Sequence, residues 1–204
     1  MPQRIALFGG SFDPIHFGHL ISARSIAEQL DLQKIELIPS ARPPHKKDLA
    51  LSQPKHRLEM ARLAVQGDNL FEISDLEFLR EGPSYTIDTV NEFRQKLGSS
   101  AELFWIIGAD SLPELHSWYR ARELVELVQI VTAARPGLRP PEASELAAWA
   151  GPLAAQRLLQ FCRPTPEIQI SSSEIRHRNK EGKSIRYLVP ESVMSYIQLH
   201  SLYQ

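Results

Sequence analysis

Apolar residues in this 204-residue chain form short continuous runs, and these alternate with longer stretches in which apolar positions recur every three or four residues. Short apolar runs bounded by Gly or Pro are typical of strands that are buried on both faces. Such runs predict strands at 5–8, 35–38, 70–74, 103–107 and 128–133. The helical spacing predicts helices at 16–30, 84–97 and 190–202, and a further helix that Ser52 caps.

Strands that alternate with helices at this spacing form βαβ units. We therefore expect a doubly wound, Rossmann-like α/β fold with a mostly parallel sheet of five or six strands and a C-terminal helical portion. Ligands bind such sheets beyond the carboxyl ends of the strands. The residues that directly follow each strand are consequently the first candidates for a functional site.

The remaining part of the chain is less regular. Residues 138–164 carry two stretches of helical spacing that Gly151 and Pro152 interrupt, and we expect a peripheral helical segment there. Ser171 and Glu174 fit a capping box, which predicts a helix from Ser172 to about 180. We treat the chain as one domain with three parts: a core at 1–137, the peripheral segment at 138–164, and a motif helix and final helix at 165–204.

Composition narrows the class of protein. The 23 Lys and Arg residues against 24 Asp and Glu give a net charge of -1, which argues against a general nucleic-acid coat protein. The single Cys162 cannot form an internal disulfide, which favours a reducing compartment. The near-apolar run at 103–109 is shorter than the ~20 residues of a membrane span, and no signal-peptide pattern is visible. We expect a cytoplasmic monomer or homo-oligomer without a nucleic-acid or membrane partner.

The end of the first predicted strand carries the densest candidate chemistry. Gly9 and Gly10 permit positive φ and a close approach of the backbone to a ligand. His16 and His19 follow three residues apart in the first turn of a helix, whose N-terminus suits an anion. A histidine pair at this spacing is often a surface feature, and zinc would need more ligands than Asp13 could add. The position at a strand end favours contact with a phosphate.

Basic residues gather in two further places on this nearly neutral chain. Lys46 follows a Pro-Pro turn after the second strand, and Arg176 lies near a capped helix start, so both are candidates for phosphate binding. Lys47 and Lys180 are interpreted as solvated surface charges.

The segment from Gly10 to His19 resembles the signature of the nucleotidyltransferases that share an HxGH motif with class I aminoacyl-tRNA synthetases. Six ordered blocks make the resemblance more specific, to the bacterial nicotinate-nucleotide adenylyltransferases. These blocks are 43–46, 83–86, 108–111, Trp118, 135–137 and 170–176. The resemblance covers about 3–137 and 165–200, and Ser11 stands where the family often has Thr. Residues 138–164 carry no recognisable motif.

The resemblance implies transfer of the adenylyl group of ATP to nicotinate mononucleotide, giving deamido-NAD and pyrophosphate in NAD biosynthesis. It implies Mg²⁺ as a cofactor that the ATP phosphates and water hold, with no dedicated protein ligand. The catalytic residues implied are His16, His19, Lys46 and Arg176. The ATP-binding residues implied are Gly9, Gly10, Ser11, Phe12, His16, His19, Gly108, Asp110, Arg135, Ser172, Ser173 and Arg176. The mononucleotide-binding residues implied are Ser11, His45, Lys46, Ser84, Tyr85, Thr86, Asp110 and Trp118.

Several of these residues admit a second interpretation. Trp118 would stack on the pyridinium ring, although indole side chains more often pack in a core. Asp110 would bind a ribose hydroxyl or an amino group, or cap a helix that begins at 111. The backbone N–H groups of Tyr85 and Thr86 would bind the nicotinate carboxylate. Three other aromatic residues, Trp105, Trp149 and Tyr187, are interpreted as packing.

Two alternative functions remain open. A pantetheine-phosphate adenylyltransferase or a cytidylyltransferase would share the HxGH motif, although neither has a nicotinate ring for Trp118 to hold. A catalytically silent nucleotide-binding regulator belongs to a different class. The presence of both histidines together with Lys46 and Arg176 argues against it.

Overall fold

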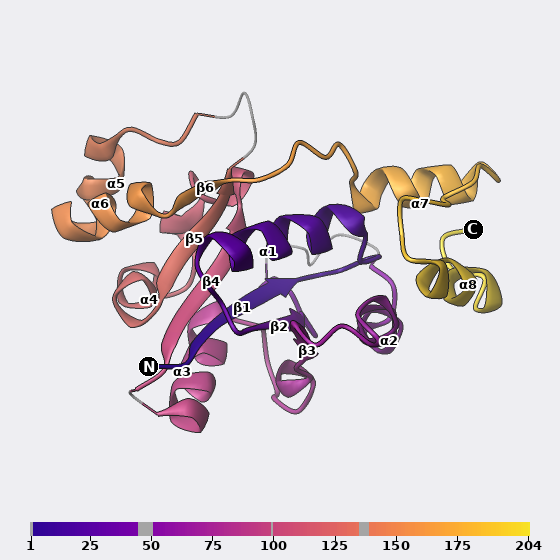
Figure 1. Cartoon of the computed structure of the whole chain (residues 1–204), viewed down its shortest axis with the longest axis horizontal. Helices are drawn as coiled ribbons and strands as arrows, with labels where there is room; N and C mark the ends of the chain where they lie inside the picture. Colours follow the sequence, from indigo (N-terminus) through magenta and orange to yellow (C-terminus); the bar gives the residue numbers. More distant parts are fainter. Residues whose placement is uncertain (1, 45–50, 99, 135–138) are drawn as a thin grey trace.

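The structure is a computed structural model that describes residues 2–44, 51–98, 100–134 and 139–204. Within these residues, six strands form one sheet in the order β3-β2-β1-β4-β5-β6, and every neighbouring pair is parallel (Figure 1). The strands are β1 (Arg4–Gly10), β2 (Lys34–Pro39), β3 (Phe71–Ile73), β4 (Glu102–Gly108), β5 (Gln129–Ala134) and β6 (Cys162–Pro164). The predicted doubly wound α/β fold is confirmed.

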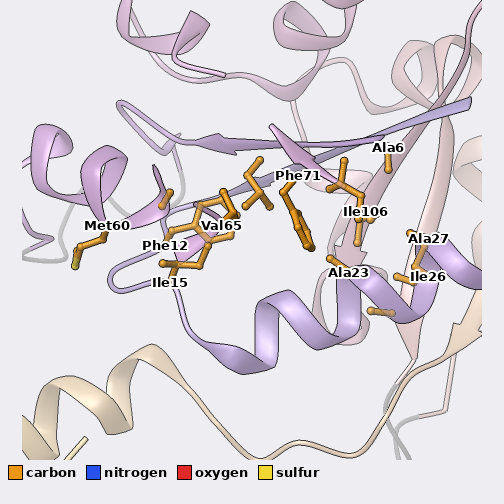
Figure 2. Close-up of a cluster of buried hydrophobic side chains, with 14 of the residues drawn as sticks. Ala6, Phe12, Ile15, Ala23, Ile26, Ala27, Met60, Val65, Phe71 and Ile106 are labelled. Atoms are coloured by element: carbon orange, nitrogen blue, oxygen red, sulfur yellow. The ribbon is translucent and has the colours of Figure 1, made fainter. Parts of the chain in front are cut away.

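Helices cover both faces of the sheet, because consecutive side chains of a strand point to opposite sides. In β4, Phe104 and Ile106 join one buried cluster, whereas Trp105 and Ile107 join the other. The first cluster, part of which Figure 2 shows, takes side chains from α1 (Phe17–Gln29), α2 (Pro54–Ala64), α7 (Ser172–Lys180) and α8 (Glu191–Leu199). The second takes them from α3 (Thr86–Leu97), α4 (Ala121–Leu127), α5 (Ala143–Ala150) and α6 (Pro152–Gln160).

The start of α2 differs from the prediction. The N-cap residue is Gln53 rather than Ser52, and Pro54 occupies the first helical turn, where its missing N–H is not needed. The backbone of Ser52 is used elsewhere: its N–H donates to Asp13 and its carbonyl accepts from Arg57. A serine before a helix was therefore a misleading capping signal.

Helices α3 and α8 are also shorter than predicted. The predicted helix at 84–97 begins only at Thr86, with Tyr85 as its N-cap in an extended conformation, and it ends at Gly98 as expected. The final helix opens after Pro190 as predicted but stops at Leu199. Ser201 and Tyr203 adopt positive φ, which ends the helical geometry before 202.

The segment at 138–164 contains the two expected helices, α5 and α6, which Gly151 separates at a φ of 85°. It is less peripheral than predicted, because Leu146 and Leu158 are buried in the second cluster. Its last three described residues form β6, which pairs with β5 at the sheet edge. Sequence analysis missed this strand, since three residues carry too little pattern.

The C-terminal portion folds back on the N-terminal half. Ser171 caps α7 by accepting a hydrogen bond from the Glu174 backbone at 3.1 Å, which confirms the predicted helix start. The Ser192 hydroxyl of α8 donates to the Leu63 carbonyl of α2. Figure 1 shows the chain passing from β6 along α1 to reach this position. Of the helices in the described part of the chain, none is both long and apolar enough to cross a bilayer.

Candidate active site

The strand order reverses between β1 and β4, because β1 connects to β2 on one side while β4 and β5 extend the sheet on the other. Such a switch point separates the loops beyond the carboxyl ends of the two central strands and leaves a crevice. Two neighbouring cavities lie there. Six residues from the ends of β1 and β4 and from the segment after β4 line both cavities and are here called the shared wall: Phe8, Ile106, Ile107, Gly108, Asp110 and Ser111.

The first, here called the histidine cavity, encloses about 200 Å³. Its floor comes from the start of α1, and its outer wall comes from the segment that follows β6. Besides the shared wall, it is lined by His16, Gly18, His19, Ser22, Ala133, Thr165, Pro166, Ile168 and Ile170.

The two histidines lie together as the sequence predicted. Their rings stack with centroids 3.7 Å apart and planes 24° apart. The His16 backbone N–H donates to Nδ1 of His19 at 3.3 Å. In the neutral ring this places the proton of His19 on Nε2, so that His19 keeps a donor on its opposite side. Phe12 meets the His19 ring edge to face at 5.1 Å, which limits how the imidazole can tilt.

The second, here called the aromatic cavity, encloses about 340 Å³ on the other side of the shared wall. The ends of β1 and β2, the start of α3 and the loop after β4 all contribute to it. Besides the shared wall, it is lined by Gly9, Gly10, Ser11, Ser40, Pro43, Pro44, Glu77, Ser84, Tyr85, Thr86, Trp105, Glu114, Trp118 and Tyr119.

The glycines at the end of β1 serve packing rather than positive φ. A Cβ on Gly9 would lie 2.5 Å from the Trp105 ring, and one on Gly10 would lie 2.9 Å from the Phe12 ring. Neither glycine is among the positive-φ residues of the described chain, whereas Phe12 itself has a φ of 45°. Neither glycine uses the positive φ that its residue type permits, and an aromatic ring occupies the space beside each missing Cβ.

Asp110 lies where both cavities meet. It belongs to the short 3-10 helix η3 (Ala109–Ser111), for which Gly108 is the N-cap, so the alternative that Asp110 caps this helix is wrong. Its carboxylate folds back over the backbone, since a Cβ on Gly108 would lie 2.6 Å from Oδ1. The missing side chain of Gly108 thus gives this carboxylate its position on the shared wall.

The backbone N–H groups of Tyr85 and Thr86, which are predicted to bind the carboxylate, differ in their hydrogen bonding. The Tyr85 N–H donates to the Pro83 carbonyl at 3.0 Å. For the Thr86 N–H, no acceptor occurs among the described residues. Ser84 is tied to the loop after β2 twice: its N–H donates to the Arg42 carbonyl at 2.9 Å, and its hydroxyl accepts from the Arg42 N–H at 3.0 Å.

Aromatic side chains close the outer side of the aromatic cavity. Trp118 is half-buried and follows the 3-10 helix η4 (Leu115–Ser117). Tyr119 stacks on Tyr85 with centroids 4.3 Å apart and remains 51% exposed. Trp105 is buried, which confirms its packing role, although its ring also reaches this cavity. Tyr187 is 81% exposed, so the prediction that it packs in the core is wrong.

Some predicted site residues line neither cavity. Phe12 is 2% exposed, packs in the first cluster and contacts the His19 ring. Ser172 donates to the Pro14 carbonyl at 2.9 Å. Arg176 donates to the Asp13 carbonyl at 2.8 Å and to the exposed Ser173 hydroxyl at 3.3 Å. These α7 side chains therefore hold the loop that leads into His16.

Three predicted site residues cannot be placed in this way. His45, Lys46 and Arg135 lie outside the described residues.

Sequence analysis missed two buried charges beside the site. Arg57 is 1% exposed, and Glu77 is 4% exposed and lines the aromatic cavity. Arg57 shares the inward face of α2 with Met60 and Ala61, at the three- and four-residue spacing of an apolar stripe. A lone arginine in such a stripe was the available signal. Glu77 lies in the short 3-10 helix η2 (Leu76–Phe78), which offers no periodicity to read.

Known proteins match this chain over most of its length. The cytidylyltransferase-like family matches residues 7–178. A protein of Desulfitobacterium hafniense (strain Y51), named probable nicotinate-nucleotide adenylyltransferase, is 41% identical over 203 residues, which is 100% of this chain and 97% of that protein. A protein of Thermus thermophilus with the same name is 45% identical over 99% of this chain and 100% of its own.

A solved structure shares the fold. The nicotinic acid mononucleotide adenylyltransferase of Plasmodium falciparum, complexed with NaAD, superposes with a TM-score of 0.76 at 20% identity. The superposition covers 98% of this chain and 97% of that chain.

Proposed function

The chain belongs to the cytidylyltransferase-like family and, within it, to the nicotinate-nucleotide adenylyltransferases, and on that premise we propose that its two cavities bind ATP and nicotinate mononucleotide side by side. The chain transfers the adenylyl group of ATP to nicotinate mononucleotide, giving nicotinate adenine dinucleotide and pyrophosphate. The observation that carries this proposal is the shared wall at Gly108 and Asp110, because it lets two ligands meet at one point.

The reaction needs no nucleophile from the protein. A phosphate oxygen of the mononucleotide attacks the α-phosphorus of ATP, the new P–O bond forms, and the bond to the bridging oxygen of the β-phosphate breaks. The electron pair leaves with pyrophosphate. What the chain contributes is orientation of the two phosphates and donors for the charge that develops on the α-phosphate.

We assign the histidine cavity to ATP. The Nδ1 atom of His19 accepts a backbone hydrogen bond, which places the proton of the neutral ring on Nε2, and we assign this N–H to the α-phosphate as a donor. His16 is 5% exposed and stacks against it, which fixes the plane of both rings. We further propose that Lys46 and Arg176 bind the phosphates. The support for Arg176 is its bond to the Asp13 carbonyl, three residues before His16.

We assign the aromatic cavity to nicotinate mononucleotide. The indole of Trp118 supplies a face for the pyridinium ring, and the start of α3 supplies N–H groups for the nicotinate carboxylate. Ser11 directly follows β1 and lines the aromatic cavity, and we propose that its hydroxyl contacts the attacking phosphate. Asp110 is the carboxylate common to both cavities, and it suits a ribose hydroxyl.

We infer that Mg²⁺ would arrive at the site together with the triphosphate. Within the described residues, no group of three or more His, Cys, Asp or Glu side chains could hold a metal ion. When bound, Mg²⁺ would neutralise charge on the phosphates while keeping mostly water and phosphate ligands. Asp110 is the carboxylate placed to orient one of those waters.

We also propose that the chain works as a single domain in the cytoplasm. The support is its one cysteine, Cys162, which carries no partner thiol in the sequence. Burial raises the pKa of the Cys162 thiol, so it stays protonated and unreactive at neutral pH.

Pyrophosphate release tests the function. The purified protein should release pyrophosphate from ATP with nicotinate mononucleotide, and His19→Ala should lower kcat by ~100-fold or more, the scale of one preorganised donor. His116→Ala, at an exposed histidine, is the matched control. Turnover of ATP with phosphopantetheine but not with nicotinate mononucleotide would identify a pantetheine-phosphate adenylyltransferase. No turnover with either acceptor would favour the silent regulator.

A further inference from the structure

Arg57 is a buried cation beside the site, and the proposed reaction does not use its charge. It lies on α2, is 1% exposed, and its guanidinium points toward the carboxyl ends of β1 and β2 rather than into either cavity. Burial lowers the pKa of Arg57, whereas the nearby carboxylates of Asp13 and Glu77 raise it. A buried charge of this kind is costly unless its donors are satisfied.

Backbone carbonyls from three separate loops satisfy those donors. Nη1 donates to the Ser11 carbonyl at 2.8 Å and to the Ser40 carbonyl at 2.6 Å. Nη2 donates to the Ala41 carbonyl at 3.3 Å, and Nε donates to the Ser52 carbonyl at 3.1 Å. One planar group therefore joins the loop after β1, the loop after β2 and the segment that leads into α2.

The same connection continues to the nicotinate-binding turn. Arg42 directly follows Ala41, and its backbone carbonyl and N–H both form hydrogen bonds with Ser84. Ser84 immediately precedes the Tyr85 and Thr86 amides. The Ser11 loop, the 40–42 loop and the Ser84 turn form three walls of the aromatic cavity. The Arg57 guanidinium binds the first two directly and is linked to the third through Arg42.

The histidine cavity is connected to Arg57 less directly. Besides the shared wall, it is lined by His16, by residues of α1, by Ala133 and by the 165–170 segment, and none of these accepts a hydrogen bond from Arg57. The route to it runs through the Ser11 carbonyl to the Phe12 ring, which packs on His19. A loss of the guanidinium should therefore act on the aromatic cavity, where three walls are held, more than on the histidine cavity.

We propose that Arg57 is a positioning residue that shapes the mononucleotide cavity far more than the ATP cavity. The inference rests on the proposed function, since it takes the aromatic cavity as the acceptor site. A fork of several N–H groups in one plane is needed to hold carbonyls that approach from three directions, and a lysine ammonium does not supply it.

Two variants test this role. Arg57→Lys keeps the charge but loses the fork, and Arg57→Gln removes the charge and keeps two N–H donors. In both we expect KM for nicotinate mononucleotide to rise by about tenfold or more, the scale of one lost charge-assisted hydrogen bond. KM for ATP should stay within about twofold, a change equivalent to less than half a kcal/mol. Arg62→Lys is the matched control, because Arg62 lies on the same helix but pairs with Asp75 at the surface.

Each outcome decides the question. Equal changes in both KM values, or none, would overturn the positioning role, and so would two variants that fail to fold, because Arg57 would then support the whole fold. If the native protein shows no turnover of nicotinate mononucleotide, the proposed function fails instead. Calorimetric titration of each variant with the mononucleotide and with ATP then still shows whether Arg57 affects one cavity far more than the other.

Discussion

The hydroxyl of Tyr203 donates a hydrogen bond to Oδ1 of Asp13 at 2.7 Å, across nearly the whole length of the chain. Asp13 is 1% exposed, and its other carboxylate oxygen accepts from the Ser52 N–H at 3.2 Å. Its backbone carbonyl accepts from Arg176. The C-terminal residues are thus joined to the loop that leads from β1 into the histidine pair.

Removal of this hydroxyl should destabilise the fold. Burial and the neighbouring Asp13 raise the pKa of Tyr203 above its ordinary value, so the hydroxyl is protonated and can donate at neutral pH. Tyr203→Phe leaves Oδ1 of Asp13 buried without that donor, and the free energy of unfolding in urea should fall by ~1–3 kcal/mol. Tyr187→Phe, at an 81% exposed tyrosine, is the control. An unchanged unfolding midpoint in Tyr203→Phe would show that the bond contributes nothing.

Much of the fold could be predicted because strands buried on both faces and capped helices carry strong local patterns. The strand at 103–107 and the N-cap at Ser171 are both found where the sequence placed them, although only the Ser171 half of the predicted capping box forms. The three-residue strand β6 could not be predicted, since its only distinguishing feature is a tertiary one, its pairing with β5. Tertiary contacts also explain why Ser52 does not cap α2, since its backbone bonds with Asp13 and Arg57.

The site divides along the same line. His16, His19 and Asp110 follow strands or begin helices, so a sequence that predicts the strands also predicts these positions. Trp118 follows the short 3-10 helix η4, and it was the family resemblance that pointed to it. Arg57 and Tyr203 act through contacts with loops that are distant in sequence, and Glu77 accepts a hydrogen bond from Thr89 of the neighbouring helix α3. No local pattern encodes such contacts.

Trp118 should contribute to the binding of the mononucleotide and not of ATP. Trp118 lines the aromatic cavity but not the histidine cavity. Trp118→Ala should therefore weaken nicotinate mononucleotide binding by roughly 1–3 kcal/mol, the scale of one aromatic stack on a base. ATP affinity should change little. Isothermal titration with each ligand measures both effects, and Trp149→Ala, at a half-buried tryptophan of α5, is the control. Equal losses for both ligands would mean that Trp118 is a packing residue.

The junction of α2 and α8 should make stability depend on pH. Nδ1 of His56 lies 2.9 Å from the Tyr196 hydroxyl, and its ring lies 5.2 Å from that of His200. Burial, followed by the charges of Lys55 and His200, lowers the pKa of His56 in the folded state. The unfolded chain therefore takes up this proton first as the pH falls below about 6.5, the ordinary value for histidine.

The sign of the effect follows from this difference. The contribution of neutral His56 is fully present above that pH, and it is lost as the pH falls through the lower pKa of the folded state. The melting temperature should drop between about pH 7 and pH 5, and the drop should be smaller in His56→Gln, which keeps a polar partner for Tyr196 but does not titrate. Thermal melts across this range measure it. An equally steep drop in the variant would exclude His56 as the source.

The chain should prefer nicotinate mononucleotide over its amide, and backbone donors should produce that preference. The turn at 83–86 contains no Arg or Lys. Arg80, the basic residue that precedes it, donates to Glu92 at 2.5 Å and to Thr89 at 3.2 Å, and it lines neither cavity. A carboxylate offers an acceptor oxygen to each of two N–H groups, whereas an amide presents its NH₂ donor to one of them. This exchanges a charge-assisted bond of ~1.5–3 kcal/mol for a donor facing a donor.

The ratio of kcat/KM values for the acid and the amide should accordingly be ~100-fold or more. The Thr86 N–H, for which the described residues supply no acceptor, is ready for the carboxylate. The Tyr85 N–H must first leave the Pro83 carbonyl, and a three-residue turn of this kind releases it at low cost. Because Arg80 is already paired with Glu92, Arg80→Ala should leave the ratio unchanged. A collapse of the ratio in that variant would show that a side-chain charge selects the acid, and equal values for the two substrates in the native protein would exclude selection at this turn altogether.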